Sequence, residues 1–145
     1  MIEYFSRTAL AAATLASFSG CGGPGEAGPR VYPVSGKVLI DGKPADKARI
    51  SFHASGAAVG PSTPYAVSGQ DGSFRPTTIL AEDGAPAGEY SLSVIWPAVT
   101  VDHGEEVDGP DRLRGAYNNP QTSGLKATIK EGANELPPLE LKTRR

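Results

Sequence analysis

The sequence has few of the residue types from which most catalytic and metal sites are built. Its 145 residues include one cysteine, Cys21, and two histidines, His53 and His103. A lone cysteine has no partner within the chain, and no HExxH motif, GxSxG motif or Cys/His pairing is present. His53 also falls on the polar side of an expected strand. We therefore expect a protein that is not an enzyme and uses no metal or other cofactor.

The chain also lacks a strong charge of either sign and a long apolar run. Fourteen basic and sixteen acidic residues give a formal net charge of −2. There is no basic stripe, and Arg144-Arg145 is too small a cluster, so nucleic acid is not an expected partner. The apolar stretch from Thr8 to Phe18 is shorter than the roughly 20 residues of a membrane-spanning helix. Nothing in the sequence indicates an oligomeric state.

The first twenty residues have the pattern of an export signal. Met1 to Arg7 is a short polar head, and Thr8 to Phe18 is mostly Ala, Leu and Phe. Ser19-Gly20 then supply the small residues that precede a cleavage site. The sequence therefore predicts a signal peptide over residues 1–20.

The only cysteine follows this segment directly. The run Phe18-Ser19-Gly20-Cys21 resembles the lipobox of bacterial lipoproteins, in which the cysteine is lipidated and becomes the mature N-terminus. The resemblance implies a membrane anchor at Cys21, since several acyl chains hold a protein stably where one chain is marginal. The alternative is a soluble secreted domain cut near Gly20, with an unpaired cysteine. Residues 21–30, CGGPGEAGPR, are expected to form a flexible tether.

Beyond residue 30, apolar and polar residues alternate over short stretches, as in half-buried β-strands. The opening stretch reads as two strands, Val34 to Ile40 and Ala48 to Phe52, joined through a turn at Asp41-Gly42. Asp71-Gly72 predicts a second hairpin, and Pro76 indicates that its return strand is an edge strand or ends early.

The clearest strand runs from Glu89 to Trp96 and is expected at the centre of a sheet, with Trp96 at the core margin. Two closing strands are expected, one from Leu125 to Lys130 and one at Leu139–Leu141. About seven strands at this spacing predict an all-β fold, an antiparallel β-sandwich over residues 31–145. The residues expected to be mostly buried are Val38, Ile40, Ile50, Phe52, Phe74, Tyr90, Leu92, Val94, Trp96, Leu125 and Ile129.

The order of these motifs is similar to that of a known family. VSGKVLIDGKPADKARISF, then SGQDGSF, then APAGEYSLSVIWP resemble the carboxypeptidase regulatory-like, transthyretin-like domains of bacterial exported proteins. The tail YNNPQTSGLKATIKEGANELPPLEL resembles the closing section of small lipoproteins with this domain. The resemblance implies a transthyretin-like or immunoglobulin-like sandwich that serves as an accessory module, and it implies no particular activity.

The connection from residue 97 to residue 124 is the one insertion and the one place where a ligand site is expected. Its first half holds five acidic residues, which either bind Ca²⁺ or form a solvated acidic loop. Its second half offers Arg112, Arg114, Tyr117 and Asn119 as a binding patch for a carboxylate or sugar. In the alternative, Tyr117 packs against the sandwich and Asn119-Pro120 makes a turn.

We therefore expect a non-enzymatic, lipid-anchored protein of the cell envelope, facing the periplasm or the cell exterior. It would reach the membrane through lipidated Cys21 and serve as an interaction or structural module with an envelope protein or glycan partner. The alternative function is a carbohydrate- or calcium-binding module that uses loop 97–124.

Overall fold

The computed structural model describes residues 28–56 and 62–144, and within them the chain forms strands and turns. The expected signal peptide (1–20), Cys21 and tether residues 22–27 lie outside the described residues. No helix in the described part is long and apolar enough to cross a membrane. The strands are β1 (Val31–Tyr32), β2 (Val34–Ile40), β3 (Lys43–Pro44), β4 (Arg49–Ala54), β5 (Tyr65–Val67), β6 (Ser73–Phe74), β7 (Ala85–Pro86), β8 (Gly88–Ile95), β9 (Pro97–Asp102), β10 (Glu105–Asp111), β11 (Lys126–Ile129), β12 (Asn134–Glu135) and β13 (Leu139–Leu141).

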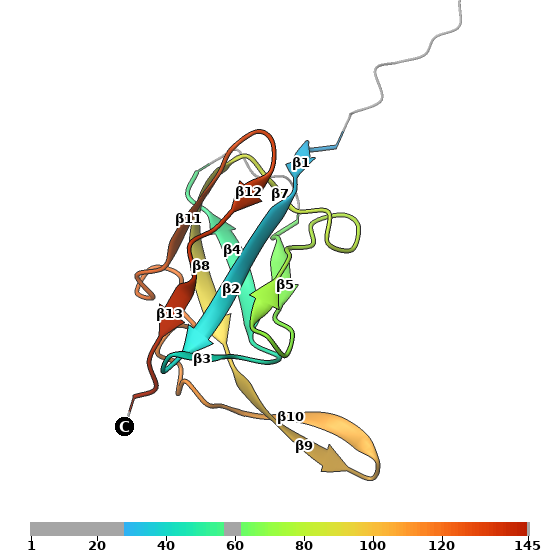
Figure 1. Cartoon of the computed structure of the whole chain (residues 1–145), viewed down its shortest axis with the longest axis vertical. Coiled ribbons are helices and arrows are strands. Elements are labelled where there is room, and N and C mark those ends of the chain that lie inside the picture. The colour runs from blue at the N-terminus through green and yellow to red at the C-terminus, as the bar shows by residue number, and fades with distance from the viewer. Residues whose placement is uncertain (1–27, 57–61, 145) are drawn as a thin grey trace, which may run out of the picture.

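Two sheets pack face to face as a β-sandwich, which confirms the expected fold class (Figure 1). The first sheet is antiparallel, in the order β11-β8-β4-β5, and places β8 at its centre as expected. The second sheet is built on β2, which pairs antiparallel with β3 and β6. In one detail the expectation of antiparallel sheets is wrong, because β12 and β13 run parallel to β2. This parallel pairing joins a strand near the start of the domain to two strands near its C-terminal end. The C-terminal strands therefore complete the second sheet.

The two expected hairpins are not simple hairpins. β2 and β4 lie in different sheets, and the turn at Asp41-Gly42 leads only to the short strand β3. In the same way, β5 pairs with β4 and β6 pairs with β2, so the Asp71-Gly72 turn carries the chain from one sheet to the other. Alternation shows which side chains face inward, but both sheets face the same core. It therefore cannot assign a strand to a sheet.

The turn positions themselves are confirmed. Asp41 and Gly42 have φ angles of 51° and 79°, the left-handed pair that a tight two-residue reversal needs. Gly72 has a φ of 76°, and a Cβ atom there would lie 2.5 Å from the carbonyl oxygen of Val38. Pro76 follows the end of β6, in agreement with an early end to that strand.

The core lies between the two sheets and contains most of the expected residues. Phe52 is fully buried, with ring centroids 5.9 Å from Tyr90 and 6.4 Å from Phe74. Trp96 and Leu125 are only partly buried and pack against the core edge. The indole N–H of Trp96 donates to the carbonyl oxygen of Asp46 at 2.9 Å, as expected for a residue at the margin. The buried residues that were expected are Val38, Ile40, Ile50, Phe52, Phe74, Tyr90, Leu92, Val94 and Ile129.

Two further pieces lie at opposite ends of the sandwich (Figure 1). β1 and β7 pair at the end where the described chain begins, and β9 and β10 form a hairpin at the other end. Residues 97–111, expected to be part of a loop, are therefore mostly strand. Of the expected tether, the structure describes residues 28–30, and a Cβ atom built on Gly28 would lie 3.8 Å from Cδ1 of Ile79.

Replacing Phe52 with alanine tests the core. Because Phe52 contacts rings from both sheets, Phe52→Ala should lower the free energy of unfolding by about 3–5 kcal/mol. The matched control is Val101→Ala, at a residue that is 71% exposed, for which the change should stay within about 0.5 kcal/mol. Urea denaturation followed by fluorescence measures both. Equal effects in the two variants would contradict this description of the core.

Candidate functional site

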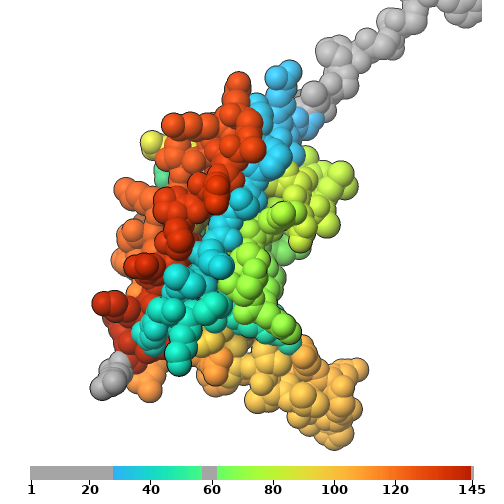
Figure 2. Space-filling view, viewed as in Figure 1, coloured from blue at the N-terminus to red at the C-terminus, as the bar shows by residue number. Residues whose placement is uncertain are grey.

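The β9–β10 hairpin projects from the sandwich as a separate arm (Figure 2). β9 begins at Pro97, two residues after the end of β8, so the arm continues a central strand out of the core. Its turn is formed by His103 and Gly104, with φ angles of 49° and 86°. Among the described residues, β9 and β10 pair only with each other, so both outer edges of the arm carry unpaired backbone groups.

One face of the arm, together with the nearby sheet, exposes apolar side chains. Val99 and Val101 share a face because they pair with Asp108 and Glu106 across the hairpin. They are 39% and 71% exposed, and Val67 on the neighbouring edge strand β5 is 51% exposed. Since valine side chains gain free energy when they leave water, exposed valines gathered at one place indicate a contact surface.

Two ion pairs set this face of the arm against β4 and the turn that precedes it. The Lys47 ammonium donates to Glu106 at 2.5 Å, and the Arg49 guanidinium donates to Asp108. The hydrogen bond to Glu106 raises the pKa of Lys47 above its ordinary value of 10.5. All four side chains are exposed, so these pairs are weak and sensitive to salt.

Between the arm and the sheet lies an open cleft of about 550 Å³, lined by both ion pairs and by Val67, Val99 and Val107. We refer to this cleft together with Val101 as the arm cleft.

The base of the arm is held much more firmly, by the carboxylate of Asp111. Its Oδ1 atom accepts the backbone N–H groups of Trp96 at 2.9 Å and Leu113 at 3.0 Å, and its Oδ2 atom accepts that of Gly115 at 2.9 Å. Leu113 is fully buried and fixes the chain where it returns from the arm. Neither role was expected from the sequence. Leu113 is an isolated apolar residue, and the pattern of acids around Asp111 did not distinguish it from the exposed ones.

Three of the four side chains expected to form a binding patch make separate contacts, and the fourth, Arg114, is exposed. The guanidinium of Arg112 lies over the Trp96 ring, 4.1 Å from its centroid, and Arg114 is exposed with a φ of 52°. Tyr117 is partly buried against the core, and its hydroxyl oxygen accepts the N–H of Lys142 at 3.2 Å. Asn119 Oδ1 accepts the N–H of Gln121 at 2.9 Å within a turn. This arrangement is the alternative in which the segment docks against the sandwich.

The acidic residues of this region do not gather around a common point. Asp102 pairs with the ring of His103 at 2.8 Å, while Glu106, Asp108 and Asp111 have the separate partners given above. Across residues 28–56 and 62–144, no group of three His, Cys, Asp or Glu side chains is placed to hold a metal ion. The calcium form of the alternative function therefore has no cluster of three carboxylates among the described residues to support it.

The other histidine makes a polar contact on the outer face of the first sheet. His53 was expected to be exposed, but it is partly buried, and its Nε2 atom lies 2.9 Å from the hydroxyl oxygen of Ser93. Ser93 is 8% exposed and pairs with Ser51 of β4. Among the described residues, no carboxylate is hydrogen-bonded to the His53 ring, so the pair lacks the third group that orients a catalytic base.

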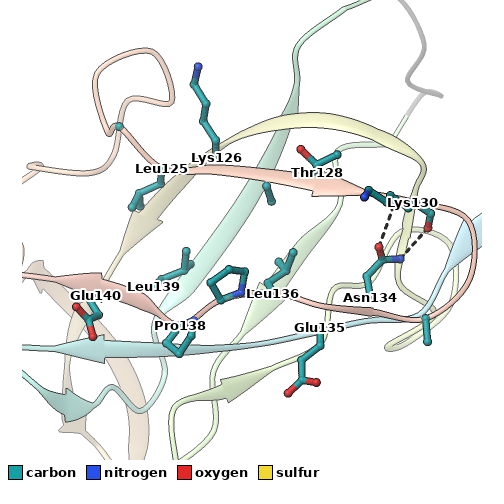
Figure 3. Close-up of a pocket in the computed structure, with 14 residues that line it drawn as sticks. Leu125, Lys126, Thr128, Lys130, Asn134, Glu135, Leu136, Pro138, Leu139 and Glu140 are labelled. Atoms are coloured by element: carbon teal, nitrogen blue, oxygen red, sulfur yellow. Dashed lines mark hydrogen bonds between the residues drawn. The ribbon is translucent and has the colours of Figure 1, made fainter.

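An apolar groove of about 670 Å³ separates β11 from the segment that holds β12 and β13 (Figure 3). Leu125, Leu136 and Leu139 point into it, whereas Lys126 and Glu135 point away. Its walls are poor templates for an added strand. The Asn134 side chain hydrogen-bonds both backbone groups of Lys130, and Pro137-Pro138 removes two donors from the other wall.

A loop at the opposite end from the arm carries a second exposed apolar pair. In loop 77–84, Ile79 is 58% exposed and Leu80 is 71% exposed. The Asp83 carboxylate accepts the backbone N–H groups of Thr78, Ile79 and Leu80, at 2.7, 3.0 and 2.8 Å. Burial alone would raise the pKa of Asp83, but these N–H groups outweigh it and hold the pKa below its ordinary 3.8.

The anchoring of the arm can be tested at two aspartates on β10. Asp111→Ala leaves three backbone N–H groups without their acceptor and should lower the free energy of unfolding by about 2–4 kcal/mol. Asp108→Ala removes only an exposed ion pair and should cost less than about 1 kcal/mol. Urea denaturation measures both values. A cost for Asp108→Ala as large as that for Asp111→Ala would show that the ion pairs, not Asp111, hold the arm.

The loop carboxylate makes a pH-dependent contribution. Because the folded-state pKa of Asp83 lies below 3.8, its ionised form stabilises the folded protein above about pH 3.8 and this contribution is lost as the pH falls through the folded-state pKa. Asp83→Asn should therefore cost about 1–2 kcal/mol at neutral pH, and the difference from wild type should shrink in acid. Denaturation at a series of pH values measures this difference. A difference that stays constant down to about pH 2.5 would contradict the assignment.

No protein-family model matches the chain, and no curated protein matches it. Among solved structures, it is similar to part of a 9R-lipoxygenase from Cyanothece PCC8801, with 15% identity and a TM-score of 0.39. The likeness covers 77% of this chain and 16% of the lipoxygenase chain. A likeness this weak carries no conclusion about activity.

Proposed function

We propose that this chain is a non-enzymatic, lipid-anchored protein of the bacterial cell envelope that docks a partner protein in the arm cleft. Its β-sandwich would be an accessory domain of the carboxypeptidase regulatory-like, transthyretin-like kind. The observation that carries the proposal is the arm itself, a hairpin that stands off the core and leaves Val99, Val101 and Val107 exposed. A two-stranded ribbon with exposed valines gains free energy when another surface covers it.

The anchor is supported by the sequence around Cys21, the only cysteine in the chain. It directly follows the predicted signal peptide, within the lipobox-like run Phe18-Ser19-Gly20-Cys21. The first strand begins at Val31, ten residues later (31 − 21). Those residues span at most about 35 Å when fully extended. The lipid would therefore hold the β1 end of the domain near the membrane, and the arm at the other end would point away from it.

A protein partner fits the arm cleft better than a glycan does. The cleft combines apolar side chains with two ion pairs and lies beside unpaired strand edges, all of which a polypeptide can use. Sugars are commonly held by stacking on an open aromatic face, and none of the described side chains that line the cleft is aromatic. At the base of the arm, one face of the Trp96 ring is covered by the Arg112 guanidinium.

The absence of enzymatic activity is part of the proposal. It is supported by the lack of catalytic motifs in the sequence and by the isolation of the His53–Ser93 contact from any carboxylate among the described residues.

Site-specific photo-cross-linking in cells tests the proposal. A photo-reactive residue at position 101 should cross-link to one discrete envelope protein, and the same residue at exposed position 126 on β11 should not. Val101→Asp should reduce co-purification of that protein about tenfold or more, because a buried charge costs over 1.4 kcal/mol. Thr128→Asp is the matched control, since it adds the same charge at an exposed position of β11, outside the arm cleft.

Cys21→Ala separates the anchor from the docking site. Under the proposal this variant leaves the membrane fraction and loses the cross-link in cells. Equal cross-linking from positions 101 and 126 would overturn the docking site. A rise in unfolding temperature with millimolar Ca²⁺ or envelope sugars would instead favour the ligand-binding alternative.

A further inference from the structure

We propose that loop 77–84 is a second membrane contact, which lays Ile79 and Leu80 on the phospholipid surface and orients the anchored domain. This inference rests on the proposed lipid anchor at Cys21. It assigns a lipid surface to an apolar pair that neither the core nor the arm cleft uses.

The loop presents these two side chains rigidly. Ile79 and Leu80 are adjacent and are 58% and 71% exposed, although a leucine or isoleucine gains free energy by leaving water. Three backbone N–H groups bound by Asp83 keep the loop from folding the pair inward. The backbone N–H of Glu82 also donates to Thr77 Oγ1 at 2.9 Å, so a second hydrogen bond joins the two ends of the loop. A preorganised loop loses little conformational entropy when it meets a surface.

The loop lies where the chain would leave the membrane. A Cβ atom built on Gly28 would be 3.8 Å from Cδ1 of Ile79, so the first described residue lies close to that side chain. The pairing of Tyr32 with Ala85 also places the start of the described chain next to the loop, because Ala85 directly follows the loop. In Figures 1 and 2 the yellow-green loop lies near the blue start of the described chain, and the arm lies at the far end.

Covalent geometry limits how far the loop can be from the anchor. Gly28 lies seven positions after Cys21 (28 − 21). Seven Cα-to-Cα steps span at most about 25 Å. A lipid at Cys21 would therefore keep Ile79 within about that distance of the bilayer, which raises the effective concentration of the loop at the surface. Two side chains alone bind lipid weakly, but added to an anchor they are sufficient to set an orientation.

The charges around the loop do not oppose this contact. A carboxylate oxygen of Glu82 lies 3.9 Å from a guanidinium nitrogen of Arg75. The Asp83 carboxylate accepts hydrogen bonds from the loop backbone. Arg30 directly precedes β1, which pairs with β7 at this end of the domain, and it supplies a second basic residue there. Two acids and two bases balance, so the loop fits a zwitterionic phospholipid surface without a net repulsive charge.

The single cysteine of the chain makes a direct test possible. Lipidation would consume the thiol of Cys21, so Leu80→Cys in the full-length protein would offer the only reactive thiol. This variant, purified from bacterial membranes and labelled with an environment-sensitive dye, is placed in phosphatidylcholine vesicles that contain nitroxide lipid. Val101→Cys is the matched control, because Val101 and Leu80 are both 71% exposed.

The label at position 80 should be quenched several-fold more strongly than the label at position 101. Adding Ile79→Asp to the Leu80→Cys protein should reduce that quenching toward the level of the control. Ile79 and Leu80 are outside the core, so both proteins should keep the wild-type unfolding temperature, which is measured alongside.

The outcomes separate this inference from the anchor on which it rests. No thiol on the wild-type protein and equal quenching at positions 80 and 101 would overturn the loop contact and leave the anchor intact. One reactive thiol on the wild-type protein would overturn the anchor and this inference with it. Shielding of the label at position 80 without vesicles would assign the loop to a protein surface, such as a second copy of the chain, and would also overturn the lipid contact.

Discussion

The contact of Phe52 with Phe74 and Tyr90 joins the two sheets, and the rest of the fold depends on it. Phe52 lies on β4 of the first sheet and Phe74 on β6 of the second, with centroids 6.4 Å apart. The Phe74 ring occupies the space above Gly36, where a Cβ atom would lie 2.3 Å from it. A side chain at Gly36 would therefore push Phe74 away from Phe52. The core is specified as much by this glycine as by the aromatic residues.

Alternation in the sequence predicted the inward side chains well, because a strand has only two faces and one of them must avoid water. Val38, Ile40, Ile50 and Phe52 all took their expected places. The pairing of strands was harder to predict. β2 and β4 follow each other in the chain and share a period, but backbone hydrogen bonds carry no side-chain signature that tells one sheet from the other. Assigning them needs the long-range pairing of β2 with the C-terminal strands.

The arm was missed for a related reason. β10 contains Glu105, Glu106, Asp108 and Pro110, which are poor strand formers, and its turn uses His103-Gly104 rather than the commoner Asn-Gly or Asp-Gly. β9 contributes the β-branched residues of the hairpin. Its backbone pairing with β10 holds β10 extended although β10 contains poor strand formers. The expected patch residues Arg112 and Tyr117 proved to be parts of the frame beneath the arm. A list of polar residues shows which side chains can bind a ligand, but tertiary contacts decide which are already engaged.

The positions of the arm and of loop 77–84 connect the two proposals physically. Both are exposed apolar features, and a single contact with one partner cannot cover both, because they lie at opposite ends of the sandwich (Figure 1). Under the proposal, a lipid at Cys21 would make the two ends unequal, since it would hold the loop end near the membrane and leave the arm end in water. A domain tied down at one point would rotate freely. The loop as a second contact would restrict that rotation, and the arm cleft would be presented to a partner away from the membrane at a lower entropic cost of docking.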